Sequence, residues 1–288
     1  MKKPFLILFL VATVQTAKAA TTINSANKFS YGANIGWIDW RGDATNGARI
    51  GQYVCSGYIY GANVGWINLG GGAPTNGIFY QNVSANDFGV NNDGLGNLRG
   101  YAYGANIGWI NFENTSAPRL DLKTGRLTGF VFSANCGWIS LSNAFAFVQT
   151  DTIAPAADTD GDGIADAWEY QKFGNLTAAN AGSNADGDPA TDLQEYLADT
   201  NPNNASSHLR ITAYATAPTG VTNLLTWTSE LTRNYRVEAT LSLNPPAVWY
   251  GSGLGLVFPD GTFTTRNVTD TNSPMRFHRI RAVIPLSP

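Results

Sequence analysis

The stretch YGANIGWIDW at residues 31–40 occurs in four related copies along this chain. The others are YGANVGWINL at 60–69, YGANIGWINF at 103–112 and FSANCGWISL at 132–141. Their tryptophans are separated by 29, 43 and 29 residues and are Trp37, Trp66, Trp109 and Trp138. The first and third copies are thus as far apart as the second and fourth, which indicates a pair of repeats that was duplicated as a unit.

Each copy is predicted to form a β-hairpin. In the third copy, residues 101–103 and 109–112 are the expected strands and residues 104–108 the turn. All four turns keep an asparagine and a glycine at the same places, which indicates a side-chain cap and a positive φ. A further strand at 120–122, followed by a turn at 123–125, gives three short strands per copy, so residues 20–150 are expected to form a domain of repeated β-meanders.

Side chains alternate along a strand, so the two faces of such a hairpin differ. In the third copy one face carries Ala102, Ile110 and Phe112, whereas the other carries Tyr101, Tyr103, Trp109 and Asn111. A sandwich, a barrel or a solenoid of stacked copies would cover both faces. We expect the aromatic face to be an inner packing layer, because about a dozen exposed rings would form an unusually large apolar patch. The alternative is an open aromatic strip that stacks on sugar rings.

The repeat pattern is similar to that of uncharacterised exported bacterial proteins over roughly residues 27–148, a resemblance that implies no known activity. The two cysteines, Cys55 and Cys136, occupy positions that other copies fill with Leu, Ile or Val. They are expected either to form a disulfide or to be buried apolar residues.

The N-terminus is typical of a secretory signal peptide. Lys2 and Lys3 precede an apolar run at 4–14, and Ala17-Lys18-Ala19 is a small-x-small cleavage site. We expect residues 1–19 to be removed and the mature chain to be secreted, either extracellular or at the cell surface. An uncleaved membrane anchor is the alternative, and no membrane span is expected after cleavage because no other segment has about 18 consecutive apolar residues.

The negative charge of the chain is concentrated in one segment. Removal of the signal would change the formal net charge from −3 to −6, while residues 151–206 alone carry nine Asp, two Glu and one Lys. An acidic block between nearly neutral flanks favours cation binding. The rest of the chain has no basic footprint typical of nucleic-acid binding.

The segment DTDGDGIADAWE at residues 158–169 fits the pattern of a twelve-residue calcium loop at every specified place. Calcium takes six to eight oxygen ligands, and alternate residues of a tight loop converge on one point. Gly163 allows the sharp turn, and a helix is expected at 166–173. The candidate ligands are Asp158, Asp160, Asp162, the Ile164 carbonyl, Asp166 and Glu169.

A second loop follows 26 residues later and is expected to bind calcium more weakly. Asn184 removes one charge, and Pro189 replaces the turn glycine with a residue whose φ is fixed near −65°. A helix is expected at 192–198. The candidate ligands are Asn184, Asp186, Asp188, the Ala190 carbonyl, Asp192 and Glu195.

The segment 158–202 resembles bacterial thrombospondin type 3-like calcium repeats and, in its loop chemistry, the EF-hand. That resemblance implies a rigid, calcium-dependent spacer, and residues 151–206 are accordingly interpreted as a calcium-binding linker module. A sensor would need a larger apolar groove to expose on binding.

Residues 207–288 are predicted to be β throughout, which favours a small sandwich of the fibronectin type III or immunoglobulin kind. The sequence weakly resembles a terminal module of exported bacterial proteins. Its last strand carries Arg276, His278, Arg279 and Arg281, interpreted as edge-strand charge, with an anionic-ligand site as the alternative. The expected strands are 209–215, 222–228, 235–242, 248–251, 255–258, 262–268 and 276–284.

No catalytic constellation can be assembled from the two histidines, His208 and His278, and no phosphate-binding loop is evident. The sequence therefore predicts a mainly β, non-enzymatic surface or matrix protein whose calcium-stiffened spacer separates two β domains. Extracellular polysaccharide and a cell-surface protein are the partners considered besides calcium. The alternatives are a glycan-binding protein that uses the aromatic face and a polysaccharide hydrolase with a carboxylate pair among Asp39, Asp43, Asp87 and Glu113.

Overall fold

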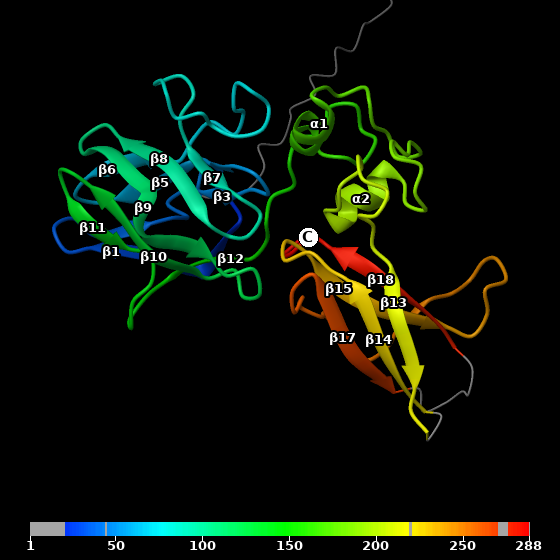
Figure 1. Cartoon of the computed structure of the whole chain (residues 1–288). Helices are drawn as coiled ribbons and strands as arrows, with labels where there is room; N and C mark the ends of the chain where they lie inside the picture. Colours follow the sequence, from blue (N-terminus) through cyan, green and yellow to red (C-terminus); the bar gives the residue numbers. More distant parts are fainter. Residues whose placement is uncertain (1–20, 44, 219–220, 270–275, 288) are drawn as a thin grey trace, which may run out of the picture.

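The computed structural model describes residues 21–43, 45–218, 221–269 and 276–287. The chain is mainly β, with 43% of residues in strands and, in the described part, two helices. Along the sequence, a barrel is followed by the helical segment and then by two small sheets (Figure 1). The expected signal peptide, residues 1–19, lies outside the described residues.

The N-terminal part is a closed eight-stranded barrel. It closes because the last strand pairs with the first, with Tyr31 opposite Ser140. The barrel strands, in spatial order, are β1 (Ile23–Gly32), β2 (Gly36–Asp39), β5 (Tyr58–Gly61), β6 (Gly65–Asn68), β8 (Leu98–Gly104), β9 (Gly108–Leu120), β10 (Leu127–Ser133) and β11 (Gly137–Ser140). Shorter strands adjoin it: β3 (Arg49–Ile50) with β4 (Cys55–Ser56), β7 (Val90–Asn92) on β8, and β12 (Val148–Thr150) on β1.

Each copy of the repeated sequence forms one antiparallel hairpin of the barrel, in equivalent register. In the first three copies the tryptophan lies opposite a tyrosine, as in Tyr31 opposite Trp37, and in the fourth Phe132 lies opposite Trp138. The expected separate strand at 120–122 is wrong, because β9 continues to Leu120 and Asp121 begins a turn.

The four turns are joined to one another by a closed ring of hydrogen bonds. Each turn asparagine donates its Nδ2 to a backbone carbonyl of the neighbouring hairpin's turn, at distances of 3.0–3.1 Å. The donor and acceptor pairs are Asn34 to Cys136, Asn63 to Ile35, Asn106 to Val64 and Asn135 to Ile107. The expected asparagine cap therefore acts between copies rather than within one.

The glycine that follows has the expected positive φ, for example 78° at Gly65, and a Cβ there would lie 3.2 Å from the Asn106 amide. The turn residue between the asparagine and the glycine is buried in every copy, with 5% exposure at Ile35, Val64, Ile107 and Cys136. These four side chains belong to the barrel core, which they join at the end where the turns lie.

The expectation that the aromatic face is an inner packing layer is wrong. The four repeat tryptophans are 45–51% exposed, whereas the isoleucines that follow them, such as Ile67 and Ile110, are at most 2% exposed. An eight-stranded barrel has an interior just wide enough for a filling of side chains, and the aliphatic face supplies that filling. Trp40 and Phe112 are buried in the same core, whereas the four repeat tryptophans lie on the outer surface.

Cys55 and Cys136 are free and buried, which agrees with the apolar interpretation and excludes a disulfide between them. Burial raises the pKa of the Cys55 thiol to about 12, so this thiol is not a reactive nucleophile at neutral pH.

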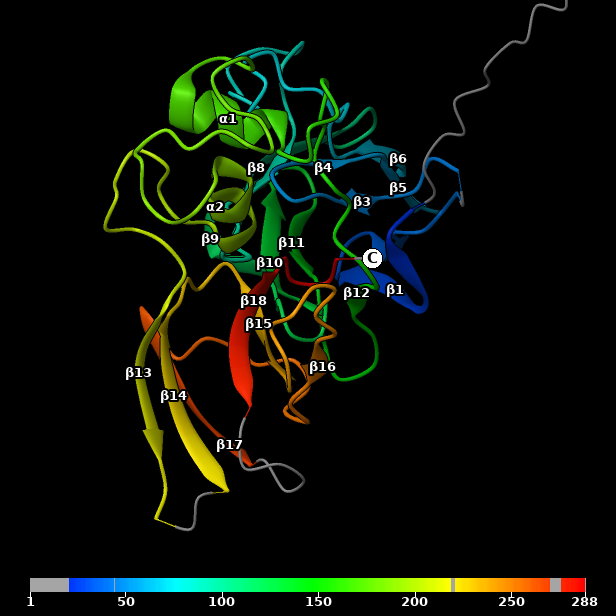
Figure 2. The ribbon, with the colours of Figure 1, turned by 90° about the vertical axis from the view of Figure 1, so that its right-hand side faces the viewer.

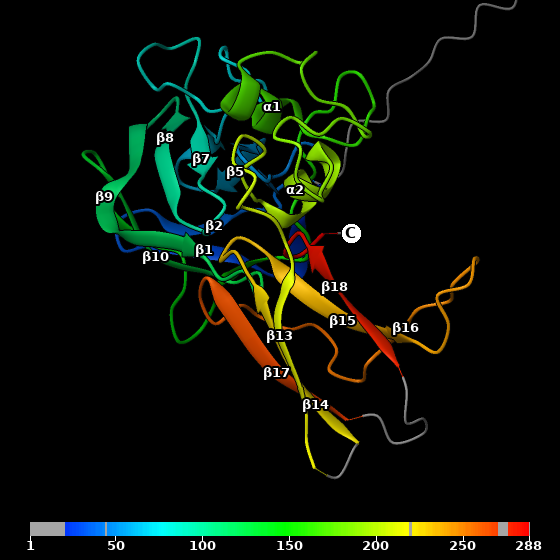
Figure 3. The same ribbon diagram turned by 45° about the vertical axis from the view of Figure 1, so that its right-hand side comes forward.

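The helices α1 (Asp166–Phe173) and α2 (Asp192–Ala198) begin and end at the residues expected from the sequence. They enclose a small core that includes Ile164, Trp168 and Tyr196, with Tyr53 of the barrel segment and Ile284 near the C-terminus packed against it. Figures 2 and 3 show both helices above the C-terminal sheets, with α2 beside the end of β18 (Phe277–Val283).

The C-terminal part contains two three-stranded antiparallel sheets around a core that includes Trp227, Tyr235 and Val268. Residues 255–258 are not a strand, since only the bridge between Tyr235 and Val257 forms there. One sheet is β13 (Ile211–Thr216), β14 (Thr222–Thr228) and β17 (Phe263–Thr269), and the other is β16 (Tyr250–Gly251), β15 (Asn234–Thr240) and β18. The basic strand β18 lies at a sheet edge, where Arg279 and Arg281 contact Glu238 at 2.7 and 3.1 Å.

Candidate metal centres

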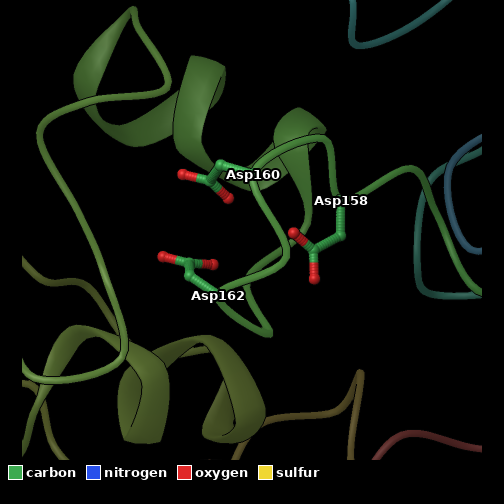
Figure 4. A group of neighbouring side chains, drawn as sticks. All are labelled: Asp158, Asp160 and Asp162. Carbon is green, nitrogen blue, oxygen red and sulfur yellow. The ribbon is translucent and has the colours of Figure 1, made fainter.

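Two clusters of acidic side chains form in the helical segment. In each cluster, one carboxylate oxygen per residue lies within 4.8 Å of the others. The first consists of Asp158, Asp160 and Asp162, whose carboxylates face a common space in Figure 4. The second consists of Asp186, Asp188 and Glu195. Carboxylate clusters of this kind can hold a metal ion, since like charges so close together are costly without a cation.

Backbone hydrogen bonds position the first cluster. Asp158 accepts from the amides of Gly161 at 2.8 Å and Gly163 at 3.0 Å, and Asp162 accepts from Ile164 at 2.8 Å. Both glycines have positive φ, 76° and 94°, which lets the chain turn sharply around the carboxylates. The Ile164 side chain is buried in the small core and anchors the end of the loop.

Glu169 on α1 is the residue at this site that most clearly requires a partner. Its side chain is fully buried, and neither carboxylate oxygen has a hydrogen-bond partner. Burial, reinforced by the charges of Asp162, Asp160, Asp166 and Asp158, raises its pKa to about 7. A buried, unpaired carboxylate is costly unless it is protonated or coordinates a cation.

Asp166, the candidate ligand at position nine, is hydrogen-bonded within the loop. Its two oxygens accept from the amide of Thr159 at 2.7 Å and from the Thr159 hydroxyl at 2.6 Å. Asp166 therefore braces the start of the loop and is not part of the carboxylate cluster.

The second loop has the same hydrogen-bond frame as the first. Asn184 accepts from the Gly187 amide at 2.7 Å, Asp188 from the Ala190 amide at 2.6 Å and Asp192 from the Ala185 amide at 3.1 Å. These bonds join positions one to four, five to seven and nine to two, as they do in the first loop. Asp192 is thus a brace like Asp166, while Glu195 joins the cluster from α2.

The loop tolerates Pro189 because the turn shared by the two loops lies at position four. Gly161 and Gly187 have φ of 76° and 75°, whereas the sequence pattern emphasises position six. Pro189 has no amide to donate to position one, but the Asn184 Nδ2 donates to the Asp188 carbonyl at 2.6 Å and holds the loop there instead. The Asp-Gly pairs at 160–161 and 186–187 are the sequence signal of this turn.

Two residues outside the loop pattern also contact the second cluster. Thr200 donates its hydroxyl to Glu195 at 3.1 Å, and the His208 Nδ1 lies 2.7 Å from an Asp188 oxygen. Burial raises the pKa of Glu195 to about 7, and the Thr200 hydrogen bond opposes that rise. His208 comes from beyond the module, so no spacing within the loop points to it.

The helical segment is bonded to both β parts of the molecule. Tyr196 donates its hydroxyl to Gln52 of the barrel segment at 3.1 Å. From the other side, Arg233 donates to the carbonyls of Leu197 at 2.8 Å and Tyr196 at 2.9 Å, at the C-terminal end of α2. The helix α2 is therefore held between the two β parts.

The carboxylates considered for hydrolysis each serve the local backbone. Asp39 pairs with Lys28 at 2.7 Å, and Glu113 accepts from the Gly100 amide at 2.7 Å. Asp87 accepts from Thr75 and Gln81, and these bonds outweigh its desolvation and lower its pKa. Asp43 accepts from the Thr45 amide at 2.7 Å and from Asn46 at 2.6 Å.

Comparison with known proteins returns no family, no curated relative and no solved structure that matches this chain. Within the described residues, no helix is sufficiently long and apolar to cross a membrane.

Proposed function

We propose that this chain is an exported, non-enzymatic, calcium-binding surface or matrix protein. In this proposal calcium binds both acidic loops and stiffens the helical segment, which then sets the spacing between the barrel and the C-terminal sheets. The observation that carries the proposal is the complete burial of Glu169 without a hydrogen-bond partner beside three converging aspartates.

The donor chemistry favours calcium over softer metals. Both clusters offer carboxylate oxygens alone, with no cysteine or histidine among the three converging residues. Hard oxygen ligands suit Ca²⁺, which tolerates irregular geometry, whereas sulfur and imidazole ligands favour zinc and copper. We assign Asp158, Asp160, Asp162 and Glu169 to the first ion, and Asp186, Asp188 and Glu195 to the second. The Ile164 and Ala190 carbonyls, and Asn184, complete the sets as expected from the loop pattern.

The spacer role is supported by contacts of α2 with both β parts, through the Tyr196 hydroxyl to the barrel segment and from Arg233 to the Tyr196 carbonyl on the other side. In keeping with the resemblance to thrombospondin type 3-like repeats, we assign residues 151–206 to this spacer. We further propose that the two C-terminal sheets form a sandwich of the fibronectin or immunoglobulin kind and present one end of the molecule to a partner at the cell surface.

Calorimetric titration of the chelator-treated mature chain with CaCl₂ tests the proposal, together with limited proteolysis. We expect two binding events, the first of higher affinity, and protection of residues 158–200 from protease when calcium is present. Titration with MgCl₂ is the control for general cation binding. Absence of heat, or identical protease patterns in calcium and in chelator, would contradict the proposal.

A further inference from the structure

The outer surface of the barrel carries four equivalent pairs of aromatic rings. In each pair the repeat tryptophan contacts the ring opposite it, with ring centres 4.8–5.0 Å apart. The pairs are Tyr31 with Trp37, Tyr60 with Trp66, Tyr103 with Trp109, and Phe132 with Trp138. Because the hairpins follow one another around a closed barrel, the pairs face different directions and do not form one continuous strip.

The second pair differs by the polar groups beside it. A pocket of about 470 Å³ is lined by Trp66, Tyr58, Asp43 and Asn46. Tyr58 lies edge-on to Trp66 at 6.4 Å, and the two rings are 42% and 47% exposed. This volume falls in the range of small-molecule sites, and the combination of aromatic surface with a few fixed polar groups is typical of them.

The polar side of the pocket is held in place by its own bonds. The backbone carbonyl of Asn46 accepts from the Tyr58 backbone amide at 2.8 Å, and the backbone carbonyl of Asp43 accepts from the Gly47 backbone amide at 2.6 Å. The Asn46 Nδ2 donates to the Asp43 carboxylate at 2.6 Å. At Gly42 a Cβ would lie 3.3 Å from the Trp66 ring, so the loop packs against the edge of that ring.

We propose that this pocket binds an uncharged hexose unit of a polysaccharide. The apolar C–H face of a pyranose ring would lie on Trp66, and the nearly perpendicular Tyr58 ring would contact the edge of the sugar. Both rings offer exposed apolar surface with little conformational freedom to lose. The sugar hydroxyl groups would donate to the Asp43 carboxylate and accept from the Asn46 amide. The negative charge of Asp43 disfavours uronic acids and other anionic sugars, since like charges repel at this distance.

The test is fluorescence and calorimetric titration of the full mature chain with three neutral probes, cellohexaose, laminarihexaose and mannohexaose. Hexagalacturonate is the anionic probe. We expect saturable binding of at least one neutral probe with a change in tryptophan emission, and no binding of hexagalacturonate. Trp66→Ala should weaken binding at least about tenfold and Asp43→Asn roughly threefold or more.

Trp138→Ala is the matched control, because this tryptophan has the same place in the fourth copy and 51% exposure, with Phe132 as its paired ring. The affinity of Trp138→Ala for the neutral probe should lie within about twofold of that of the unmodified protein. Flat titrations with all three neutral probes overturn the proposal. Preferential binding of hexagalacturonate, or an equal loss in Trp66→Ala and Trp138→Ala, overturns it as well. Binding should persist in chelator, so the result is independent of the calcium proposal.

Discussion

At the residue scale, the carboxylates of the two loop glutamates are buried with few hydrogen-bond partners, which is unfavourable and which the sequence pattern alone does not reveal. Glu169 and Glu195 are fully buried, yet Glu169 has no hydrogen-bond partner and Glu195 has one. The pattern correctly predicts that Asp158, Asp160 and Asp162 converge, because alternate side chains of a tight loop point to one side. It does not predict that Asp166 and Asp192 brace the loops, because either role suits a carboxylate at that spacing.

Replacement of Glu169 by glutamine should separate folding from metal binding. Glu169→Gln removes a buried charge with little change of shape, so the calcium-free protein should be more stable by about 1 kcal/mol. Calcium affinity of the first site should fall at least about tenfold, because the ligand that closes the loop is lost. Urea unfolding in chelator and calcium titration measure the two effects. Asp151→Asn, in the same acidic segment but outside both loops, should change neither, and unaltered affinity in Glu169→Gln would remove this residue from the site.

Glu238 should make the C-terminal part sensitive to acid. Desolvation opposes ionisation, but the hydrogen bonds from Arg279 and Arg281 outweigh it and lower the pKa of Glu238 below its ordinary value of 4.5. A group whose pKa is lowered by folding stabilises the folded state above its unfolded pKa, and that contribution is lost as the pH falls through the folded pKa.

The stability difference between the unmodified protein and Glu238→Gln should therefore be about 0.5–1 kcal/mol at pH 7, because the group is partly solvated. It should shrink progressively below pH 4.5. Urea unfolding at pH 7, 4.5 and 3 measures the change. A difference that is constant over this range would show that the arginines do not act on the ionised carboxylate.

At the element scale, hairpins and helices follow closely from local sequence, whereas closure of the barrel does not. The helix limits and the strand at Thr222–Thr228 match the expectation, since both depend on near neighbours. The pairing of β1 with β11 joins segments about a hundred residues apart, and no local signal encodes it. The inner face could not be chosen by periodicity, because both faces of the hairpin are apolar and only the width of the closed barrel decides between them.

The ring of turn asparagines gives the conserved spacing within the repeat a physical reason that can be tested. Asn63→Asp replaces the amide that donates to the Ile35 carbonyl with an acceptor that faces it, so both groups lose a partner. We expect a loss of about 1–3 kcal/mol in the stability of the barrel. Thermal unfolding followed by tryptophan circular dichroism measures it. Ala62→Ser, at the neighbouring exposed turn position, is the control, and equal stability of both variants would mean that the ring does not hold the hairpins together.

At the scale of the whole molecule, the helical segment packs between the barrel and the C-terminal sheets and contacts both of them. The C-terminal end of the chain lies beside the start of the helical segment, where the Ile153 amide donates to the Leu286 carbonyl at 2.8 Å. Tyr53 and Ile284, from opposite ends of the sequence, pack against the same small core. A sequence-based interpretation as a spacer did not include these contacts, because they join segments that are distant along the chain.

We expect Arg233 to couple calcium binding in the helical segment to the position of the C-terminal sheets. Its side chain is 4% exposed, and its guanidinium donates to two carbonyls at the end of α2 while lying 3.6 Å from the Asp199 carboxylate. A cation at a helix C-terminus is stabilising, and the planar fork of arginine serves two carbonyls that lysine cannot serve together. Arg233→Lys keeps the charge and removes this geometry.

We therefore expect Arg233→Lys to bind calcium within about twofold of the unmodified protein, because Arg233 is not a ligand. Protection of residues 199–233 from protease by calcium should nevertheless be lost, and the radius of gyration in calcium should rise toward its value in chelator. Arg236→Lys, on the exposed side of β15, is the matched control and should keep both effects. Full calcium-dependent protection in Arg233→Lys would show that the Arg233 contact does not couple calcium binding to the C-terminal sheets. The two β parts would then be held by the Tyr196–Gln52 and Ile153–Leu286 hydrogen bonds.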